Sequence, residues 1–181
     1  MECLILNGNP KPSAFDDYLT GFARGLEEKG HSAKRIDLRE MNIKFCTGCW
    51  ACWWGSPGRC AIKDDMQGLY PGIANADLLV WASPLAMGAV SALLKKVQDR
   101  VIPTMHPYIV ISKGEMHHRR RYAKNADIAL IVEPGPGDGD EDLALARRFF
   151  ERFSLNTRTA FKFFATPAKP VQEAVDEALI A

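Results

Sequence analysis

The chain has 181 residues, of which 47% are hydrophobic and 25% are charged, and its formal net charge is +1. This size and composition predict a single domain over residues 1–181, with a core large enough to fold without disulfides. A nearly neutral chain excludes the strongly basic surface of a nucleic-acid-binding protein.

The N-terminal segment MECLILNGNP predicts a first strand, because it lacks the basic region, long apolar stretch and small-residue cleavage site of a signal peptide. No apolar run approaches the length of a membrane span. We therefore expect a cytoplasmic protein with no membrane partner, in a compartment where thiols stay reduced.

The first third of the chain begins with an almost wholly apolar run over residues 3–7, typical of a parallel strand buried on both faces. Apolar residues then recur at helical spacing from Phe15 to Leu26. Ser13 is the expected cap of this helix and Gly30 its stop. The order strand, loop, helix predicts the first half of a βαβ unit.

Residues 33–38 predict a second strand at the edge of the sheet. Asp64, followed three positions later by Gln67, is a helix-start signature and predicts a helix over about residues 65–74. Pro71 should kink or shorten that helix.

Residues 77–83 predict a third, buried strand. A helix should follow, with its apolar face formed by Val90, Leu93 or Leu94, Val97 and Val101. Residues near 105–122 predict a hairpin insertion that turns at Lys113-Gly114.

The last third resumes the alternation of strands and helices. A strong strand at 127–132 and a glycine- and acid-rich loop at 133–142 precede a helix through 143–153, a strand at 159–165 and a closing helix at 171–179. This alternation indicates an α/β fold, with a parallel sheet covered by helices on both sides.

Ligands of such sheets bind at the carboxyl ends of the strands, where three loops are expected to meet. The first loop, residues 8–13, lacks the GxGxxG and GxxxxGK motifs but offers Asn9, Lys11 and Ser13 at a helix N-terminus, a cradle suited to one phosphate. An ordinary capped turn is the alternative.

The second loop, 83–88, has small apolar residues between a proline and a glycine, so a flat ring could approach its backbone. The third loop, with Glu133 and Gly135, could border the other edge of the same ring. A plain turn and a solvated acidic loop are the respective alternatives.

Four of the five cysteines fall within residues 46–60. Three are spaced by three positions and the fourth follows eight later: Cys46, Cys49, Cys52 and Cys60. One short loop that delivers four thiolates suits a cubane iron-sulfur cluster, with nearby tryptophans excluding water. Metal-free thiols are the second interpretation, and structural zinc the third, because zinc sites usually use two separated pairs. Cys3, within the first strand, is expected to be core packing.

Three segments together resemble a known family: NGNPKPS after the first strand, the block CTGCWACWWGSPGRCAIKDDM, and WASPLAMGAVSALLKKVQDR after the third strand. The chain resembles the NADPH-dependent FMN reductases and, more narrowly, the iron-sulfur flavoproteins, over about residues 1–103. The resemblance implies a flavodoxin-like three-layer αβα sandwich, with a five-stranded parallel sheet of order 2-1-3-4-5.

The same resemblance implies a non-covalent FMN. Its phosphate would bind at the first loop, to Asn9, Lys11, Ser13, Ala14 and Phe15. Its isoalloxazine ring would bind at the second loop, to Pro84, Leu85, Ala86, Met87 and Gly88. In iron-sulfur flavoproteins the four cysteines hold a [4Fe-4S] cluster, which implies Cys46, Cys49, Cys52 and Cys60 as ligands here.

The chain departs from the family pattern in several places. Ala86 stands where the family usually has an aromatic residue against the ring, and Lys11 can supply charge in a phosphate loop poorer in Ser, Thr and Asn. After Pro103 the resemblance to iron-sulfur flavoproteins weakens, and an HHRRRY run stands near the missing Gly-Gly segment. The residues from His117 to Arg121 could grip the 2′-phosphate of NADPH, but we favour a solvated hairpin edge or a subunit contact.

The function that follows is an oxidoreductase in which FMN accepts a hydride from NAD(P)H and passes electrons onward, through a cluster if one is bound. No catalytic side chain is required. The acceptor is a small molecule or a protein, and the resemblance implies a homodimer or homotetramer. The alternatives are a cluster-free flavin or quinone reductase and a non-enzymatic flavodoxin-like electron carrier.

Overall fold

The structure is a computed structural model that describes residues 1–180. Its core is a parallel sheet of five strands: β1 (Glu2–Asn7), β2 (Ser32–Asp37), β3 (Leu78–Ala86), β7 (Asp127–Glu133) and β8 (Phe161–Ala165). The strands lie in the order β2-β1-β3-β7-β8, with every adjacent pair parallel. Numbered along the parallel strands alone, this is the order 2-1-3-4-5, so the predicted flavodoxin-like topology is confirmed.

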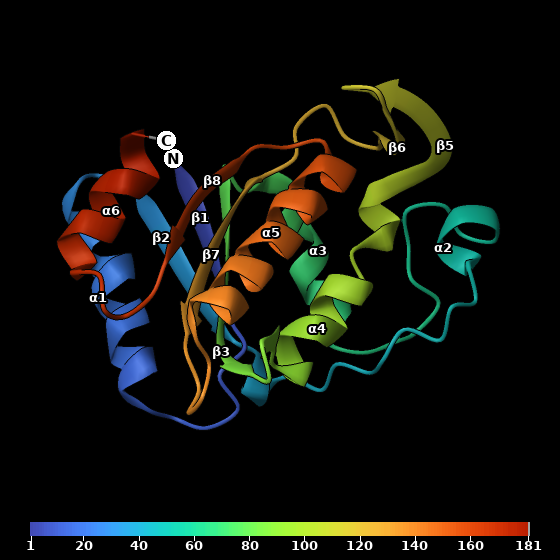
Figure 1. Cartoon of the computed structure of the whole chain (residues 1–181). Helices are drawn as coiled ribbons and strands as arrows, with labels where there is room; N and C mark the ends of the chain where they lie inside the picture. Colours follow the sequence, from blue (N-terminus) through green and yellow to red (C-terminus); the bar gives the residue numbers. More distant parts are fainter. Residues whose placement is uncertain (181) are drawn as a thin grey trace.

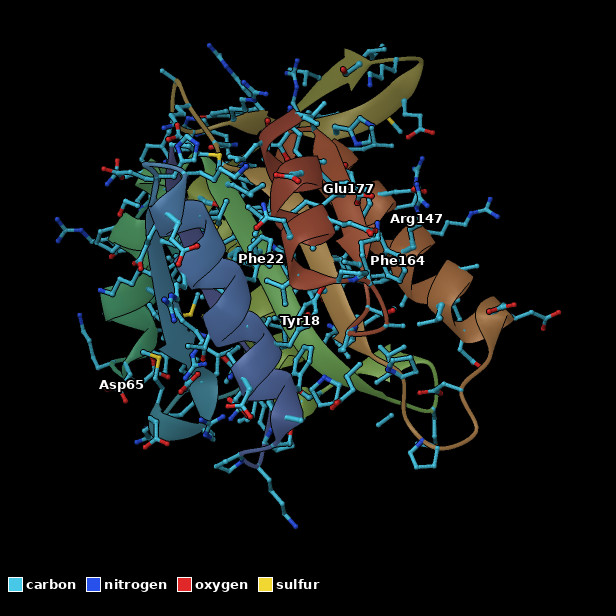
Figure 2. All side chains as sticks on the ribbon, turned by 90° about the vertical axis from the view of Figure 1, so that its left-hand side faces the viewer. Tyr18, Phe22, Asp65, Arg147, Phe164 and Glu177 are labelled. Carbon is cyan, nitrogen blue, oxygen red and sulfur yellow. The ribbon has the colours of Figure 1, made fainter. Side chains whose placement is uncertain are left out.

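Helices cover both faces of this sheet (Figure 1). On one face lie α1 (Ala14–Glu28) and α6 (Val171–Ile180), which Figure 2 shows side by side. On the other lie α3 (Met66–Asn75), α4 (Ala92–Asp99) and α5 (Asp140–Thr157). Each face has its own apolar cluster, with Phe22 of α1 in one and Trp81 of β3 in the other. The predicted three-layer sandwich is therefore confirmed.

A separate antiparallel hairpin stands beside α5. It consists of β5 (Met105–Ser112) and β6 (Glu115–Arg120), joined at Lys113 and Gly114, which both have positive φ. That backbone matches the twist of a two-residue hairpin turn. Arg152 of α5 holds the hairpin through two hydrogen bonds to the Glu115 carboxylate, at 2.9 and 2.8 Å. The hairpin predicted from the Lys113-Gly114 turn is therefore present.

The segment after the third strand differs from the prediction. β3 continues through Pro84 to Ala86, turns at Met87 and Gly88, and pairs with the short antiparallel strand β4 (Ala89–Val90). The expected loop is thus a β-hairpin, because β4 gives the end of β3 a hydrogen-bonding partner. α4 begins only after Ser91, whose hydroxyl accepts a hydrogen bond from the Leu94 N–H, so Val90 does not belong to the helix.

The start of α3 also differs. The side chain of Gln67 does not complete a capping box; its amide donates to the carbonyls of Cys60 and Ile62, at 3.3 and 2.9 Å. Pro71 does not end the helix, which runs through it to Asn75.

Three short elements complete the fold: η1 (Leu38–Glu40), α2 (Ala51–Trp54) within the cysteine segment, and η2 (Ile102–Thr104) after α4. Among residues 1–180, no helix combines the length and the apolar character that crossing a bilayer requires.

Gly8 is the tightest point between the sheet and α4. A Cβ there would lie 2.7 Å from the Leu94 Cβ and 2.9 Å from the Ser91 hydroxyl. We expect Gly8→Ala to lower the free energy of unfolding by about 1–3 kcal/mol, because overpacking forces backbone shifts.

Urea unfolding measures this, with Gly68→Ala in α3 as the matched control. A Cβ at Gly68 meets nothing within 4 Å, and alanine is the better helix former, so that variant should gain about 0.5–1 kcal/mol. Equal effects of the two substitutions would contradict the close packing at Gly8.

Candidate functional site

The first predicted loop joins β1 to α1 and is fixed by hydrogen bonds within itself. The Ser13 hydroxyl accepts from the Phe15 N–H, and the Asp16 carboxylate accepts from the Ser13 N–H at 3.0 Å, which completes a capping box. These bonds hold the loop at the positive end of the α1 dipole, where an anion is favoured.

Asp16 is the centre of a buried polar network. Its carboxylate accepts from the side-chain amides of Asn7 and Asn9, at 2.6 and 2.7 Å, and from Arg39 at 2.8 Å. Burial raises the pKa of Asp16, but the hydrogen bonds from Arg39, the Ser13 N–H and the two asparagines outweigh it, so the pKa lies below its usual value. The network therefore favours the charged form of Asp16, paired with Arg39, in the first turn of α1.

This network changes the expected roles of the loop residues. The Asn9 amide is engaged with Asp16 and the Ser13 hydroxyl, so it shapes the loop. Phe15 is fully buried in the core, which leaves only its backbone to the loop. Lys11 and Ala14 are exposed, and no described acidic residue pairs with the Lys11 ammonium. Arg39 already pairs with the Asp16 carboxylate at 2.8 Å, which leaves Lys11 as an exposed cation for an incoming anion.

The second predicted loop is the turn between β3 and β4. Met87 at its tip has φ +53° and is 98% exposed, while the side chain of Leu85 is buried in the core. Ala86 is exposed, Pro84 is half-buried and Gly88 is buried, so a ring bound here would meet mostly backbone and small side chains.

Two residues absent from the predicted site lock the three loops together. Ser91 donates its hydroxyl to the Gly8 carbonyl at 2.6 Å, which joins the first loop to the start of α4. Asp138 accepts from the Gly88 N–H at 3.2 Å and from the Gly135 N–H at 2.7 Å, which joins the second loop to the third. The loops therefore meet at one sheet edge, as their positions after β1, β3 and β7 predicted.

Gly135 allows this close approach, because a Cβ there would lie 2.9 Å from the Leu85 carbonyl oxygen. Glu133 stands at the end of β7, opposite Pro84 in the sheet register. Burial, and then the charge of Asp16, raise the pKa of Glu133. A carboxyl group beside the second loop is thereby biased towards its protonated form.

The cysteine segment brings Cys46, Cys49, Cys52 and Cys60 to one small cavity of about 40 Å³. All four thiols are free; the first two are exposed and the last two half-buried. Burial, followed by the charge of Cys60 and then of the other two thiols, raises the pKa of Cys52. The four sulfur atoms are thus close enough to influence one another electrostatically.

The structure does not show a metal centre. Among the described residues, no three His, Cys, Asp or Glu side chains are placed to hold one metal ion. The geometry therefore does not support structural zinc, and the predicted [4Fe-4S] cluster is not supported by it either. Cys3 lies in the core as expected, where burial raises the pKa of its thiol to about 12.

A buried ion pair closes the inner side of this cavity. The side chains of Arg100 and Asp64 are 0% and 1% exposed, and they bind each other directly. Arg100 also donates to the Cys60 sulfur at 3.4 Å and to the Lys44 carbonyl at 3.1 Å.

Asp64 connects the two ends of the cysteine segment. Its carboxylate accepts from the Lys44 N–H at 2.9 Å, before the cysteines, and from the Met66 N–H at 3.2 Å, after them. Burial raises the pKa of Asp64, but the hydrogen bonds from Arg100 and Lys44 outweigh it and the pKa is lowered. Sequence reasoning missed Arg100, since a single arginine at the end of a helix carries no sign of burial.

The three tryptophans of this segment behave differently. Trp50 lines the cavity. Trp53 anchors the segment, because its indole N–H points at the carbonyls of Ile102 and Met105, 3.3 and 3.1 Å away. Trp54 is exposed and outside the cavity lining, so its expected role in excluding water is not seen.

The run from His117 to Arg121 does not form one cationic cluster. His117 is buried against Asn156, and Arg121 donates to the carbonyls of Pro103 and Met105. Only Arg119 and Arg120 of the three arginines remain available at the hairpin edge. This arrangement favours the structural interpretation of the run over a 2′-phosphate site.

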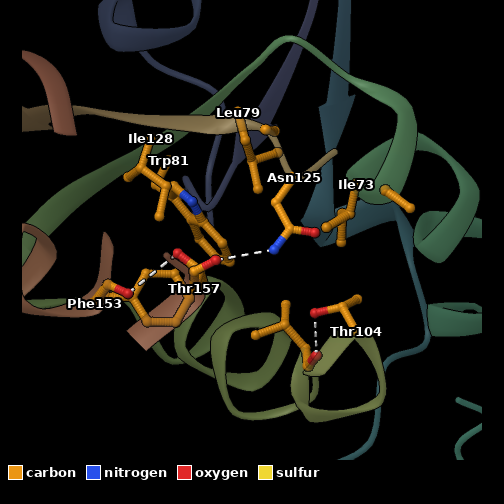
Figure 3. A pocket seen from close by; sticks show the side chains of 11 residues that line it. Ile73, Leu79, Trp81, Thr104, Asn125, Ile128, Phe153 and Thr157 are labelled. Carbon is orange, nitrogen blue, oxygen red and sulfur yellow. Dashed lines mark hydrogen bonds between the residues drawn. The ribbon is translucent and has the colours of Figure 1, made fainter. Parts of the chain in front are cut away.

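A further cavity of about 30 Å³ lies between β3, α3 and α5 (Figure 3). The Asn125 amide donates to the Thr157 carbonyl at 2.9 Å, and the Thr104 hydroxyl to the Val101 carbonyl at 2.7 Å, while the buried indole N–H of Trp81 has no partner among the described residues. With mostly apolar walls and so little room, it is a packing void.

Comparison with known proteins concerns both the loops at the sheet edge and the cysteine segment. The model of a family described as NADPH-dependent FMN reductase matches residues 1–154. An iron-sulfur flavoprotein of Archaeoglobus fulgidus is 33% identical over 100 residues, covering 55% of this chain and 48% of the relative. One from Methanocaldococcus jannaschii is 28% identical over 156 residues, covering 86% and 72%. The chain spans about half the length of most of the curated relatives it matches.

Solved structures agree on the fold. An FMN-dependent NADH-azoreductase from Bacillus anthracis, in complex with FMN, has a TM-score of 0.64 at 13% identity, covering 98% of this chain and 94% of that one. An NAD(P)H:quinone oxidoreductase from Methanothermobacter marburgensis has a TM-score of 0.62 at 20% identity, covering 97% and 93%. At these identities the likeness shows a shared fold.

The buried pair predicts how the cysteine segment is held. We expect Asp64→Ala to lower the free energy of unfolding by about 3–5 kcal/mol, because it leaves the Arg100 charge buried and unpaired. Asp99→Ala, which removes a half-exposed partner of Lys95, should cost less than about 1 kcal/mol.

Urea unfolding of both variants checks this. Adding Arg100→Met to Asp64→Ala should recover part of the loss, since the double variant buries no lone charge. If the losses in free energy of unfolding from Asp64→Ala and Arg100→Met simply add in the double variant, the pairing of Asp64 with Arg100 is contradicted.

Proposed function

The chain belongs to the NADPH-dependent FMN reductase family, and from that premise we propose that it is a flavoprotein oxidoreductase that moves electrons from NAD(P)H through FMN to an acceptor. The observation that carries the proposal is the sheet edge where Ser91 and Asp138 tie three loops together. A rigid edge of this kind is where open α/β sheets bind their ligands.

The first loop fits the FMN phosphate. The N-terminus of α1 supplies a positive dipole end, and Lys11 supplies a full charge without an acidic partner in the described chain. Asn9 and Ser13 would act mainly by keeping the loop in shape, and the backbones of Ala14 and Phe15 would face the phosphate. Arg39 is paired with the Asp16 carboxylate, so the exposed Lys11 is the residue on which phosphate affinity should depend most.

The second and third loops fit a flat ring. Pro84, Ala86 and Gly88 offer little side-chain bulk, the exposed Met87 can pack over a ring, and Leu85 contributes its backbone. Gly135 lets the third loop pack against this surface. Glu133 stands at the end of β7 beside this surface, where burial and the charge of Asp16 raise its pKa.

Bound FMN would supply hydride acceptance and electron transfer, while the chain binds and orients it. Two solved neighbours of the same fold are an FMN-dependent NADH-azoreductase and an NAD(P)H:quinone oxidoreductase. We propose a small molecule or a protein as the acceptor here. A cluster-free quinone or flavin reductase is the alternative for the same edge.

We further propose that Cys46, Cys49, Cys52 and Cys60 hold a [4Fe-4S] cluster. The support is their shared cavity, the guanidinium of Arg100 beside Cys60, and the names of the relatives. The four thiols do not converge on the position of a single metal ion. A cubane cluster does not require this, because each thiolate binds a different one of its four irons. The Arg100 charge would favour the anionic thiolates that such a cluster requires.

A cytoplasmic location and a homodimer or homotetramer remain parts of the proposal. The hairpin supports self-association, since Tyr108, Ile109, Ile111 and Met116 expose apolar side chains there.

FMN binding tests the first loop. We expect Lys11→Ala to weaken FMN binding about ten- to a hundredfold, because one charge-assisted contact to the phosphate is worth about 1.5–3 kcal/mol. Riboflavin, which lacks the phosphate, should bind both proteins equally. Fluorescence titration measures both ligands.

Lys63→Ala, at an exposed lysine of the cysteine segment, serves as the charge control and should leave FMN affinity unchanged. Equal weakening of riboflavin and FMN binding by Lys11→Ala would place the phosphate elsewhere.

Iron and acid-labile sulfide test the cysteines. After anaerobic reconstitution we expect about four of each per chain, as a cubane requires. Cys60→Ser should lower both counts, whereas Cys3→Ala, in the core, should leave them unchanged. If the protein without substitutions takes up no iron during reconstitution, the cluster-free alternative holds and the proposed FMN site is unaffected.

A further inference from the structure

A wide cavity of about 640 Å³ lies between α3, the loop that precedes it and the segment that joins β6 to β7. Gly58, Arg59 and Lys63 line it from the loop, and residues 122–124 line it from the segment after β6. None of its lining residues belongs to the three loops proposed for FMN or lines the cavity of the four cysteines. A cavity of this volume can hold a small molecule.

The charge on its walls has one sign. The whole chain is nearly balanced, with 23 Lys and Arg against 22 Asp and Glu, but this cavity is lined by Arg59, Lys63 and Lys124 and by no carboxylate. Lys124 is paired with Asp77, which lies outside the lining. Neither Arg59 nor Lys63 forms an ion pair with an acidic side chain of residues 1–180. Two exposed positive charges on one wall therefore have no counter-ion, and they favour an anion.

The neutral polar groups of the cavity are engaged elsewhere in the protein. The Gln67 amide donates to two backbone carbonyls of the preceding loop, at 3.3 and 2.9 Å. The Tyr70 hydroxyl donates to the Arg100 carbonyl at 2.9 Å. These groups already have partners, so the demand that remains on this wall is for negative charge opposite Arg59 and Lys63.

The backbone that carries the two cations is fixed before any ligand arrives. The Gly58 N–H donates to the Cys52 carbonyl at 3.0 Å, and the Arg59 N–H donates to the Ser56 carbonyl at 2.9 Å. The Gln67 amide holds the next part of the loop to α3. An ordered backbone lowers the entropy that is lost when a ligand binds.

The rest of the lining suits a flat ring. Tyr70 and Pro71 come from α3, and Tyr122, which is 41% exposed, stands on the facing segment. Because its hydroxyl is already bonded, Tyr70 offers its ring to a ligand. Tyrosine rings supply a large apolar contact area to a planar partner.

We propose that this cavity binds a small planar aromatic molecule that carries a carboxylate. The carboxylate would bind Arg59 and Lys63, because a guanidinium can donate two parallel hydrogen bonds to such a group. The aromatic body would lie along Tyr70, Pro71 and Tyr122. The site is separate from the loops proposed for FMN and does not depend on that function.

The ligand pair 2-naphthoate and 2-naphthamide tests the assignment, because the two molecules have nearly the same shape and differ in charge. Isothermal titration calorimetry is carried out with and without one equivalent of FMN. We expect the carboxylate to bind about tenfold more tightly than the amide in both conditions, since charge-assisted hydrogen bonds are the stronger ones. Added salt should reduce this preference by screening the two cations.

Substitutions separate the charge from the ring. Arg59→Gln combined with Lys63→Gln should remove the tenfold preference, whereas Tyr122→Ala should weaken both ligands by the same factor. The matched control combines Arg148→Gln with Lys34→Gln, two exposed cations that do not line this cavity, and should keep the preference. Melting temperatures close to that of the unsubstituted protein would show that every variant is folded.

Lys11→Ala distinguishes this site from the proposed FMN site. This substitution should weaken FMN binding and leave the affinity for 2-naphthoate unchanged, so either proposal can fail without the other.

Several outcomes would overturn the assignment. They are the absence of saturable binding of 2-naphthoate, equal affinity of the two ligands for the unsubstituted protein, and a preference that survives the loss of both Arg59 and Lys63. Displacement of 2-naphthoate by one equivalent of FMN would also overturn it, because the ligand would then occupy the FMN site.

Discussion

The hydrogen bonds that tie three loops at the carboxyl edge of the sheet are the constraint on which the proposed site depends. Ser91 reaches back to the Gly8 carbonyl, and Asp138 bridges Gly88 and Gly135. The Ser91–Gly8 and Gly88–Asp138 bonds cross between segments that are far apart in sequence, so the edge exists only when the whole sheet is formed. A surface fixed in this way loses little conformational entropy when a rigid ring binds.

A buried ion pair, and not neutral hydrogen bonds, holds the cysteine segment. There a fully buried guanidinium and carboxylate join the two ends of the segment, and the guanidinium contacts the Cys60 sulfur. Burying such a pair gains little net stability, because desolvation offsets the attraction. Its position next to four thiols fits a role in placing anionic sulfur, and this feature gives the proposed cluster a physical basis beyond cysteine spacing.

The order of the elements was predictable because each strand and helix carries its own pattern. Five parallel strands, the hairpin turn at Lys113-Gly114 and the Ser13 cap all follow from local periodicity and turn chemistry, and the strand order came from the family resemblance. The β3–β4 hairpin was missed, since a proline and small apolar residues at 84–88 carry no strand signal. Sequence reasoning missed Arg100, Ser91 and Asp138 for a different reason: their partners are set by tertiary packing. The ligands of the site, FMN and the cluster, follow neither from local sequence patterns nor from tertiary packing. They are inferred from the family.

The reduction of bound flavin by a nicotinamide tests the central claim most directly. Protein saturated with FMN is titrated anaerobically with NADPH and with NADH while its visible absorption is recorded. The account predicts that at least one donor bleaches the bound flavin within seconds, and that adding a quinone restores the colour. A protein that takes up no FMN, or whose bound FMN stays oxidised with both donors, would contradict it.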